Sequence, residues 1–338
     1  MKIIVFYIIF IFMLTSCSTN FYQDKESTTS RTLNLQASEN SLLYDYIQNR
    51  LNLNNISYYD NRNLETITYS YQDYIIEFNL SLSEIKNSQI IIPYSVIKND
   101  SILFNDLYIF DIHEDNSGIL LSFDDFYEIP WTTHLYMFRE ANVRVTFFCK
   151  LSWYRTATFM TLAEADKHEI GYHTMNHKGI NQETFEDFKT QIEAILLFRE
   201  HGYPMTSFAF PHGTYSDKTL SLANEYFYKT RTFRYTFQLY DFQELISNQF
   251  ISSESIDAFR WEDTNNYFTQ VKNRLILTKI TNKIYPCTTH NIVSNDSELK
   301  FNITEERLQY ILDLINLLQL KTYTFNDFNS PDIILRTN

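Results

Sequence analysis

Residues 118–127 read GILLSFDDFY, and this stretch indicates the fold class of the chain. The run Ile119-Leu120-Leu121 has no polar alternation, which is typical of a strand buried on both faces of a parallel sheet. Asp124 and Asp125 follow where this strand ends, and the carboxyl ends of parallel strands carry the functional groups of α/β sheets and barrels. The pair could serve as metal ligand and base, or it could cap the next helix; both interpretations stay open.

Working outward, predicted strands alternate with predicted helices from Gly118 to the end of the chain. VRVTFF (143–148) and SFAFP (207–211) are typical of buried strands, whereas 183–200 and 304–319 carry apolar residues at helical spacing. This alternation predicts an α/β domain, with a parallel sheet or barrel, over residues 111–330.

Glycine is rare, with 5 in the chain, and all of them lie between positions 118 and 213. A chain so poor in Gly retains it where the backbone needs a positive φ or a close approach. The exception is Gly202, which we interpret as an ordinary turn residue that ends the 183–200 helix.

The overall composition is that of a folded, acidic protein. The chain has 338 residues, 44% hydrophobic and 17% aromatic, so it can bury the core of one large domain or two ordinary ones. Lys and Arg number 28 against 41 Asp and Glu, for a formal net charge of −13. Nucleic-acid binders take most of their affinity from cations on phosphates, so this charge disfavours a nucleic-acid partner.

Residues 1–17, MKIIVFYIIFIFMLTSC, have the layout of a secretory signal peptide. The apolar stretch 3–14 is shorter than a membrane span. The segment LTSC resembles the bacterial lipobox, in which Cys17 is diacylated and anchors the protein to the membrane; a plain signal peptide is the alternative. Residues 18–38, rich in Ser, Thr, Asn and Gln, are typical of a flexible tether.

Residues 39–110 are predicted to form a small mixed N-terminal region without a chemical motif. Residues 39–52 have helical spacing, and runs such as TITYSY, YIIEF, QIIIPY and LYIF are typical of strands. An accessory domain, a substrate-binding flank and a packing support would all show this pattern, so the role of the region stays open.

Two cysteines, Cys149 and Cys287, would lie outside the cytosol if the signal is used, and thiols can oxidise there. Nothing in the sequence determines their separation in space. A disulfide and two buried thiols therefore both stay open.

Three of the chain's 8 His lie in HEIGYHTMNH, residues 168–177. His173 and His177 are four residues apart, so both imidazoles can reach one metal ion as neutral nitrogen ligands. The segment is not a zincin motif, because the spacing of His168 and Glu169 to His173 is wrong for one. Structural histidines are the alternative.

Two later segments also offer groups for chemistry. In SFAFPHGTY (207–215), a Pro and a Gly bracket His212 and could aim a backbone N–H at a developing oxyanion, unless the turn is an ordinary loop. In TTHNI (288–292), His290 follows an apolar segment and could donate a proton or cap the strand.

Taken in order, these segments resemble the polysaccharide deacetylase family, which is carbohydrate esterase family 4 with its NodB-homology domain. The motif (T/S)FDD is matched by residues 122–125, and H(S/T)xxH by residues 173–177, after a HEIG segment that is also family-like. VTFF at 145–148 resembles the strand between the two motifs. The resemblance runs from about Gly118 to about Phe328 and covers most of the chain beyond the tether.

The resemblance implies a distorted (β/α) barrel with fewer than eight full units, which agrees with the alternation of strands and helices. It also implies Asp125, His173 and His177 as the ligands of one divalent metal, usually zinc. A Lewis-acid metal that polarises a carbonyl and acidifies water supplies what amide hydrolysis needs.

The same resemblance assigns the remaining site groups. Asp124 would be the general base that activates water, and His290 the acid that protonates the leaving amine. The Thr174 hydroxyl would orient the site, and the His212 backbone amide would help to hold the oxyanion.

The chain departs from the family pattern at two positions. Ala209 stands where much of the family has an Arg that orients the base; Arg260, in AFRWED, is the nearest candidate to replace it, with a surface salt bridge as the alternative. Thr288 stands two residues before His290, where an aliphatic residue is usual. The cluster of Asp, His and Glu at 111–115 could bind a cation but is more typical of a solvated loop.

We therefore predict a membrane-anchored, extracytoplasmic, metal-dependent hydrolase of the bacterial cell envelope that removes N-acetyl groups from an amino-sugar polymer. Peptidoglycan, poly-N-acetylglucosamine and chitin-type glycans are all compatible with the sequence. Two alternatives stay open. One is a catalytically silent glycan-binding lipoprotein, suggested by the missing Arg, and the other is an esterase for O-acetyl groups of a xylan-type polymer.

Overall fold

The computed structural model describes residues 43, 46, 47, 51, 64–151, 157–257, 264–295, 301–330 and 335. The chain divides into two compact units, Met1–Leu51 and Asn52–Asn338. The predicted signal peptide and tether, with Cys17, lie outside the described residues, and so does Arg260. Within the described ranges, every helix is too short or too polar to span a bilayer.

An antiparallel sheet of five strands occupies residues 66–111. Its strands are β1 (Thr66–Tyr71), β2 (Tyr74–Asn79), β3 (Glu84–Lys86), β4 (Gln89–Lys98) and β5 (Ser101–Asp111). The long β4 is central, because it pairs with β2 and β3 along one edge and with β5 along the other. Buried and half-buried residues alternate along β4, so only one face of this sheet is fully buried.

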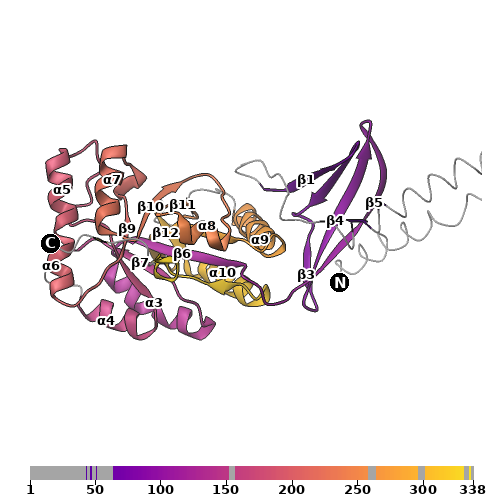
Figure 1. The fold of residues 1–338 in the computed structure, drawn as a ribbon. Helices are drawn as coiled ribbons and strands as arrows, with labels where there is room; N and C mark the ends of the chain where they lie inside the picture. Colours follow the sequence, from indigo (N-terminus) through magenta and orange to yellow (C-terminus); the bar gives the residue numbers. More distant parts are fainter. Residues whose placement is uncertain are drawn as a thin grey trace, which may run out of the picture. The chain divides into compact units, whose positions relative to one another are not determined.

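A closed parallel sheet forms the centre of the remaining chain (Figure 1). Its strands are β6 (Gly118–Asp125), β7 (Thr146–Cys149), β8 (Glu169–Tyr172), β9 (Ser207–Ala209), β10 (Lys229–Arg234), β11 (Phe250–Ser255) and β12 (Ile284–Thr289). Each strand pairs with the next in chain order, and β12 pairs back to β6, which closes the barrel. The short β15 (Lys321–Thr322) pairs with the start of β6. The predicted (β/α) barrel is confirmed.

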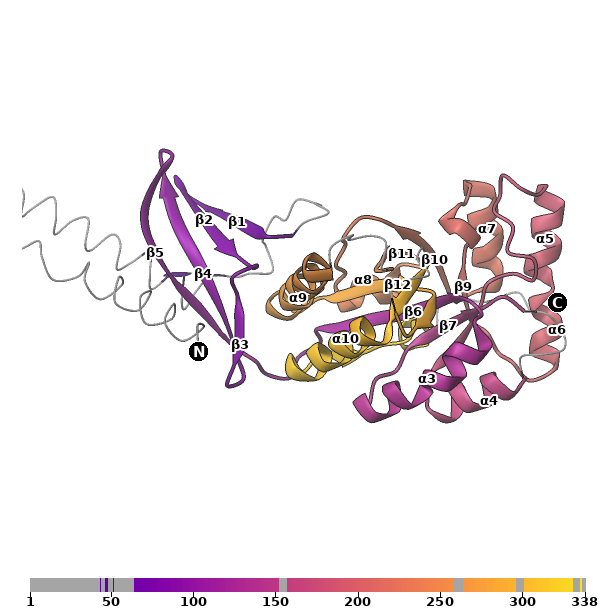
Figure 2. The same cartoon turned by 180° about the vertical axis from the view of Figure 1, so that it is seen from behind.

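Helices cover the outside of the barrel. They are α3 (Glu128–Ala141), α4 (Ala157–Ala165), α5 (Phe185–Glu193), α6 (Ile195–Glu200), α7 (Asp217–Tyr226), α8 (Phe242–Ser247), α9 (Thr264–Ile280) and α10 (Glu305–Leu317). Viewed from both sides, α5 lies beside α7 and α9 lies beside α10 (Figures 1 and 2). Smaller elements complete the fold: β13 (Asn291–Val293), β14 (Asn302–Thr304) and the 3₁₀ turns η2 (Pro211–Gly213) and η5 (Phe325–Phe328).

The helix expected over 183–200 is two helices, α5 and α6, that meet at Ala194. The Leu197 N–H donates to the Ala194 carbonyl, a 3₁₀-type bond that tightens the turn between them. The start of α5 follows the expected chemistry, because Thr184 and Asp187 form a capping box. The break was not predictable from apolar spacing, which continues across it.

Alternation along β6 directs its side chains to two different environments. Phe123 packs outward on Trp131 and Phe138 of α3, with ring centroids 6.3 and 5.5 Å apart. Since successive strand residues point to opposite faces, Leu120 and Asp124 point into the barrel. The inside of the barrel near Leu120 is a buried apolar cluster that includes Phe148 of β7.

Cys149 and Cys287 are both buried and free. Burial raises the pKa of both thiols well above the ordinary value. They are therefore two buried thiols in this structure, the second of the two possibilities left open by the sequence.

The antiparallel sheet is attached to the barrel through α9. The Leu64 N–H donates to Gln270 Oε1 at 2.6 Å, and Asn273 Nδ2 donates to the Leu64 carbonyl at 2.6 Å. Lys272 Nζ donates to the carbonyl of Ser83 at 3.0 Å. Both the residue before the sheet and the loop before β3 are thus bonded to this helix.

Gly171 in β8 gives a test of the packing inside the barrel. A Cβ at this position would lie 2.5 Å from Cδ1 of Phe148 and 2.8 Å from Oγ of Ser207. We expect Gly171→Ala to lower the free energy of unfolding by about 1–3 kcal/mol, because the core must be displaced to admit one methyl group. Urea denaturation measures this loss.

Gly202→Asn is the matched control for that variant. Gly202 has φ +90° and no atom within 4 Å of its would-be Cβ, and Asn tolerates positive φ better than most residues. Its free energy of unfolding should change much less. Equal losses in the two variants would contradict close packing at Gly171.

Candidate active site

The carboxyl ends of the barrel strands bring together Asp125, His173 and His177. Asp125 is the last residue of β6, and His173 directly follows β8. His177 Nε2 lies 2.8 Å, and His173 Nε2 3.4 Å, from the same oxygen, Asp125 Oδ1. One ligand atom from each of the three residues fits within 4.8 Å, a spacing that can surround one metal ion.

The hydrogen bonds of His173 show that this donor set suits a cation. Its Nδ1 lies 2.7 Å from the carbonyl oxygen of Ala209, which can only accept, so Nδ1 carries the proton. In the neutral ring, Nε2 is then a lone pair that faces the Asp125 carboxylate. Two facing acceptors, one anionic and largely buried, are satisfied by a metal ion between them.

Asp125 is a carboxylate at neutral pH. Burial by itself would raise the pKa of Asp125, but the neighbouring rings of His173 and His177 outweigh burial and hold that pKa well below its usual range. A permanently ionised oxygen ligand beside two imidazoles is a donor set typical of zinc.

Unusual backbone conformations position these ligands. Asp125, Thr174 and His177 have φ of 84°, 61° and 55°, in the region that non-glycine residues rarely adopt. Thr174 Oγ1 accepts the N–H of His177 at 3.0 Å and so holds the turn that separates the two imidazoles. The strain is concentrated where the ligands must converge.

Asp124 lies beside the metal-ligand cluster and is bound by a cation that the sequence analysis missed. Arg231 Nη2 donates to both Asp124 oxygens at 2.5 Å, and both residues are almost completely buried. Arg231 is on β10, where it is the register partner of Ala209. The guanidinium also lies 4.9 Å from the ring centroid of Phe148. The Arg231 guanidinium thus contacts Asp124 from β10. This strand is the neighbour of β9, where much of the family has an Arg in place of Ala209.

His290 lies at the end of β12 with a carboxylate behind it. Its Nδ1 is 3.0 and 3.1 Å from the two oxygens of Asp257, which follows β11. Burial by itself would lower the pKa of His290, but Asp257, with smaller contributions from Asp124 and Asp125, raises it to about 9. The ring is therefore protonated at neutral pH.

His212 completes this rim from the turn η2. It has φ 56°, flanked by Pro211 and Gly213, so the expected defined turn is present. The His212 ring centroid is 4.5 Å from that of His177. The side chain therefore packs against a predicted metal ligand, a contact that the sequence did not indicate.

Comparison with protein families agrees with this geometry. The family model described as Polysaccharide deacetylase matches residues 112–230. The part of the barrel from β6 to the start of β10 is therefore similar to polysaccharide deacetylases. The matched part holds both aspartates of β6, the two histidines and the turn at His212. This domain places the protein among the hydrolases that deacetylate glycans.

Solved structures with similarity to this deacetylase chain include three carbohydrate-active enzymes. Peptidoglycan deacetylase PdaC from Bacillus subtilis is 14% identical, with 65% of this chain and 92% of that chain covered and a TM-score of 0.45. Chitin deacetylase from Colletotrichum lindemuthianum is 13% identical, with 67% and 93% covered and a TM-score of 0.46. A family 4 acetyl xylan esterase from Clostridium thermocellum is 15% identical, with 62% and 89% covered and a TM-score of 0.43. Comparison with curated proteins gives no match.

Two residues of the deacetylase site were not found by sequence reasoning. Asp257 stands two residues after the end of β11, and no motif surrounds it. Arg231 is an isolated cation inside a strand, and only the closed sheet shows that it faces Asp124. Arg260, the cation that was expected there, lies outside the described residues.

The acidic cluster at 111–115 is occupied by a side chain of the protein itself. Lys279 Nζ donates to Asp115 Oδ1 at 3.0 Å and to the carbonyl of His113 at 2.6 Å. The Lys279 side chain is completely buried. The cation of this cluster is therefore an ammonium group from α9, which joins that helix to the loop before β6.

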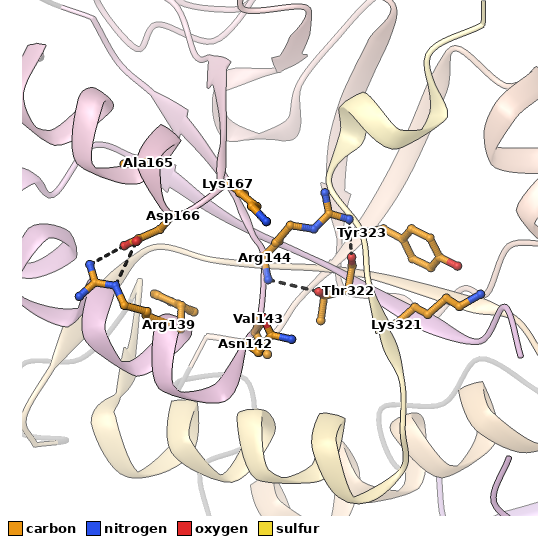
Figure 3. Close-up of a pocket in the computed structure, with 11 residues that line it drawn as sticks. Arg139, Asn142, Val143, Arg144, Ala165, Asp166, Lys167, Lys321, Thr322 and Tyr323 are labelled. Carbon is orange, nitrogen blue, oxygen red and sulfur yellow. Dashed lines mark hydrogen bonds and ion pairs between the residues drawn. The ribbon is translucent and has the colours of Figure 1, made fainter. Parts of the chain in front are cut away.

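A cavity of about 590 Å³ lies at the opposite, amino-terminal end of the strands (Figure 3). Arg144 and Lys167, which line it, precede β7 and β8. Figure 3 shows Arg139 paired with Asp166, at 2.7 Å, and Arg144 bonded to Thr322. Among the described lining residues, none belongs to the predicted site. The cavity is separate from the deacetylase chemistry.

Whether Arg231 orients Asp124 can be tested by a rescue experiment. Arg231→Met should lower kcat for deacetylation about a hundredfold with little change in KM, because a misplaced carboxylate harms the reaction more than binding. Adding Ala209→Arg should restore part of kcat, since neighbouring strands are only about 4.8 Å apart and the new guanidinium can reach Asp124. Steady-state kinetics on an N-acetylated glycan measures both variants.

The metal content and melting temperature of each variant serve as controls for folding. A double variant that stays as slow as Arg231→Met, although it is folded and metal-loaded, would show that Arg231 acts in some way other than orienting Asp124.

Proposed function

We propose that this protein is a metal-dependent N-deacetylase of an amino-sugar polymer. One observation carries the proposal: a single rim of the barrel presents a three-ligand cluster, a carboxylate held by Arg231 and an imidazolium held by Asp257. Hydrolysis of an acetamide needs these three parts, which are a Lewis acid, a base for water and an acid for the departing nitrogen.

Asp125, His173 and His177 would hold the metal, and the two-nitrogen, one-oxygen donor set favours Zn²⁺. When bound, the ion supplies polarisation of the acetamide carbonyl and acidification of water. Three protein ligands leave room in the coordination shell, as catalytic sites require. Thr174 and His212 keep the two imidazoles in place through the turn bond and the ring contact.

Asp124 is the base of the proposed reaction. It accepts the proton from the water that attacks the carbonyl carbon. Arg231 Nη2 contacts both oxygens of Asp124 and so orients the carboxylate before the substrate binds. The His212 backbone N–H is proposed to donate to the oxygen that becomes negative.

His290 is the acid. It donates its proton to the sugar nitrogen as the C–N bond breaks, so acetate and a free amine leave. Asp257 holds Nδ1 and keeps the ring charged, and Trp131 Nε1 donates to the His290 carbonyl at 2.9 Å. The ring is thus fixed in position and protonation state before the substrate binds.

The presence of Arg231 weighs against a silent glycan-binding protein. That alternative relied on the missing cation for the base, and the structure supplies this cation from β10. The predicted lipidation at Cys17 would place the enzyme at the outer face of a bacterial membrane, beside envelope glycans. The lipid anchor and this location belong to the proposal.

Acetate release provides the direct test. The purified protein, stripped of metal with a chelator and reloaded with zinc, should release acetate from N-acetylglucosamine oligomers or peptidoglycan, and the stripped protein should not. Asp124→Asn should remove turnover while zinc stays bound, because Asp124 is not a ligand; Asp313→Asn, on the exposed face of α10, is the matched control.

Zinc-loaded protein that released acetate only from O-acetylated xylan would overturn the N-deacetylase proposal. Full activity of Asp124→Asn would remove Asp124 as the base.

The pair His290–Asp257 predicts the alkaline side of the pH profile. His290 must be protonated to act, and its pKa of about 9 means that activity falls as the pH rises through that value. Asp257→Asn removes the main group that raises this pKa, so the fall should move to lower pH by about one to three units. The measurement is kcat against pH, and an unmoved alkaline limb would contradict His290 as the acid.

A further inference from the structure

The cavity at the amino-terminal end of the barrel strands has a volume of about 590 Å³ (Figure 3). Three segments line it: residues 138–144 at the end of α3 and the turn after it, residues 165–167 at the end of α4, and residues 321–323 in and after β15. A cavity of this size can hold a small molecule. Segments far apart in the chain thus form one concave surface, at the end of the barrel opposite the metal-ligand cluster.

The charge of this lining is the reverse of the charge of the whole chain. Among the described residues that line the cavity, Arg139, Arg144, Lys167 and Lys321 are cations, and Asp166 is the single anion. The chain as a whole has 28 Lys and Arg against 41 Asp and Glu. A concave surface with an excess of cations raises the local concentration of anions.

The two arginines of the cavity have carboxylate partners. Arg139 Nη2 lies 2.7 Å from Asp166 Oδ2, and Arg144 Nη2 lies 3.0 Å from Asp327 Oδ2. These two ion pairs are each neutral as a whole. The excess positive charge of the cavity therefore comes from the two lysines.

Within the described ranges, neither lysine has a carboxylate partner. Lys321 Nζ donates to the neutral amide oxygen of Asn116, at 3.0 Å. The ammonium of Lys167 makes no hydrogen bond or ion pair in the part of the chain that the structure describes. Two positive charges in one cavity are thus left without a negative group from these parts of the protein.

Arg144 also keeps donors for a ligand. Its guanidinium makes two hydrogen bonds to Asp327, at 3.3 and 3.0 Å, and one to the Thr322 carbonyl, at 3.0 Å. A guanidinium has five N–H donors, so two remain. The Lys167 side chain extends toward that of Arg144 (Figure 3). A guanidinium and an ammonium that face one space are typical of sites for phosphate oxygens.

Lys167 occupies a backbone position that Gly or Asn fills more easily. It has φ 65°, and its N–H donates to the Glu164 carbonyl at 2.9 Å in the turn that ends α4. A Cβ is unfavourable in this conformation, so a lysine here lowers stability. The dipole of α4 favours a cation at this end, but it does not account for Lys321, which lies on a strand. Binding of an anion accounts for both lysines.

We propose that this cavity binds a phosphate group, carried by inorganic phosphate or by a small phosphomonoester. A dianion matches the two ammonium charges. Its oxygens accept hydrogen bonds from Lys167 and from the remaining N–H groups of Arg144, and Lys321 adds to the positive potential. The inference is independent of the proposed deacetylase function, because these residues lie outside the metal-ligand cluster.

Calorimetric titration with inorganic phosphate tests the site. Lys167→Asn should raise Kd about tenfold, the effect of losing one charge-assisted hydrogen bond. Its melting temperature should equal or exceed that of the wild type, because Asn tolerates positive φ better than Lys. Lys321→Gln should raise Kd about threefold, because this ammonium acts through its field. Lys86→Asn makes the same charge change on β3, outside the cavity, and should leave Kd unchanged.

The titrations are made both on zinc-loaded protein and on protein stripped with a chelator, because phosphate can also bind to zinc. The effect of Lys167→Asn should be the same in both forms. Equal Kd values for Lys167→Asn and Lys86→Asn, or no saturable binding by stripped wild-type protein, would overturn the phosphate site and leave the deacetylase proposal untouched.

A second titration with glycerol 3-phosphate separates the two sources of the phosphate group. Tighter binding than inorganic phosphate, with the same dependence on Lys167, assigns the cavity to a phosphomonoester. Equal or weaker binding, again dependent on Lys167, assigns it to the free anion.

Discussion

The pairing of β12 with β6 is the constraint on which the rest of the structure depends. Parallel hydrogen bonds join Ile284–Thr289 to Gly118–Phe123 and close the sheet. Closure places the carboxyl ends of all the barrel strands around one opening. His290 and Asp125, 165 positions apart in the numbering, therefore belong to the same rim. The residues proposed as base, metal ligands and acid are brought together by this closure, because each stands at or just beyond a strand end.

The inside of the barrel explains how the chain manages without the expected Arg on β9. Ala209 and Arg231 are register partners, so their side chains point to the same side of neighbouring strands. A small residue on β9 leaves space for a long one on β10. A buried carboxylate without a cation would be costly, and Arg231 Nη2 supplies a cation to both oxygens of Asp124. A guanidinium therefore contacts Asp124 from β10 instead of from the β9 position where much of the family has an Arg.

The surroundings of the aspartates and histidines at the rim differ, and these differences suit each residue to a different proposed role. Asp125 is kept ionised by imidazoles, and His290 is kept protonated by carboxylates. His173 instead donates its Nδ1–H to a backbone carbonyl, which leaves Nε2 to face Asp125. Residues of the same type are thus proposed as metal ligand and as acid. The difference lies in what each ring nitrogen faces, which no local spacing encodes.

The sequence by itself determined the barrel and most of its site: apolar runs that end in polar residues, alternating with amphipathic helices, indicate parallel strands with functional ends. Asp124, Asp125, His173, His177, His212 and His290 were predicted as site residues because each stands in a short motif. Arg231 and Asp257 were decided only by the tertiary structure, and so was the break between α5 and α6. Arg231 acts across the barrel and Asp257 acts between strand ends, so their partners are distant in the chain, and only closure of the sheet determines which side chains meet.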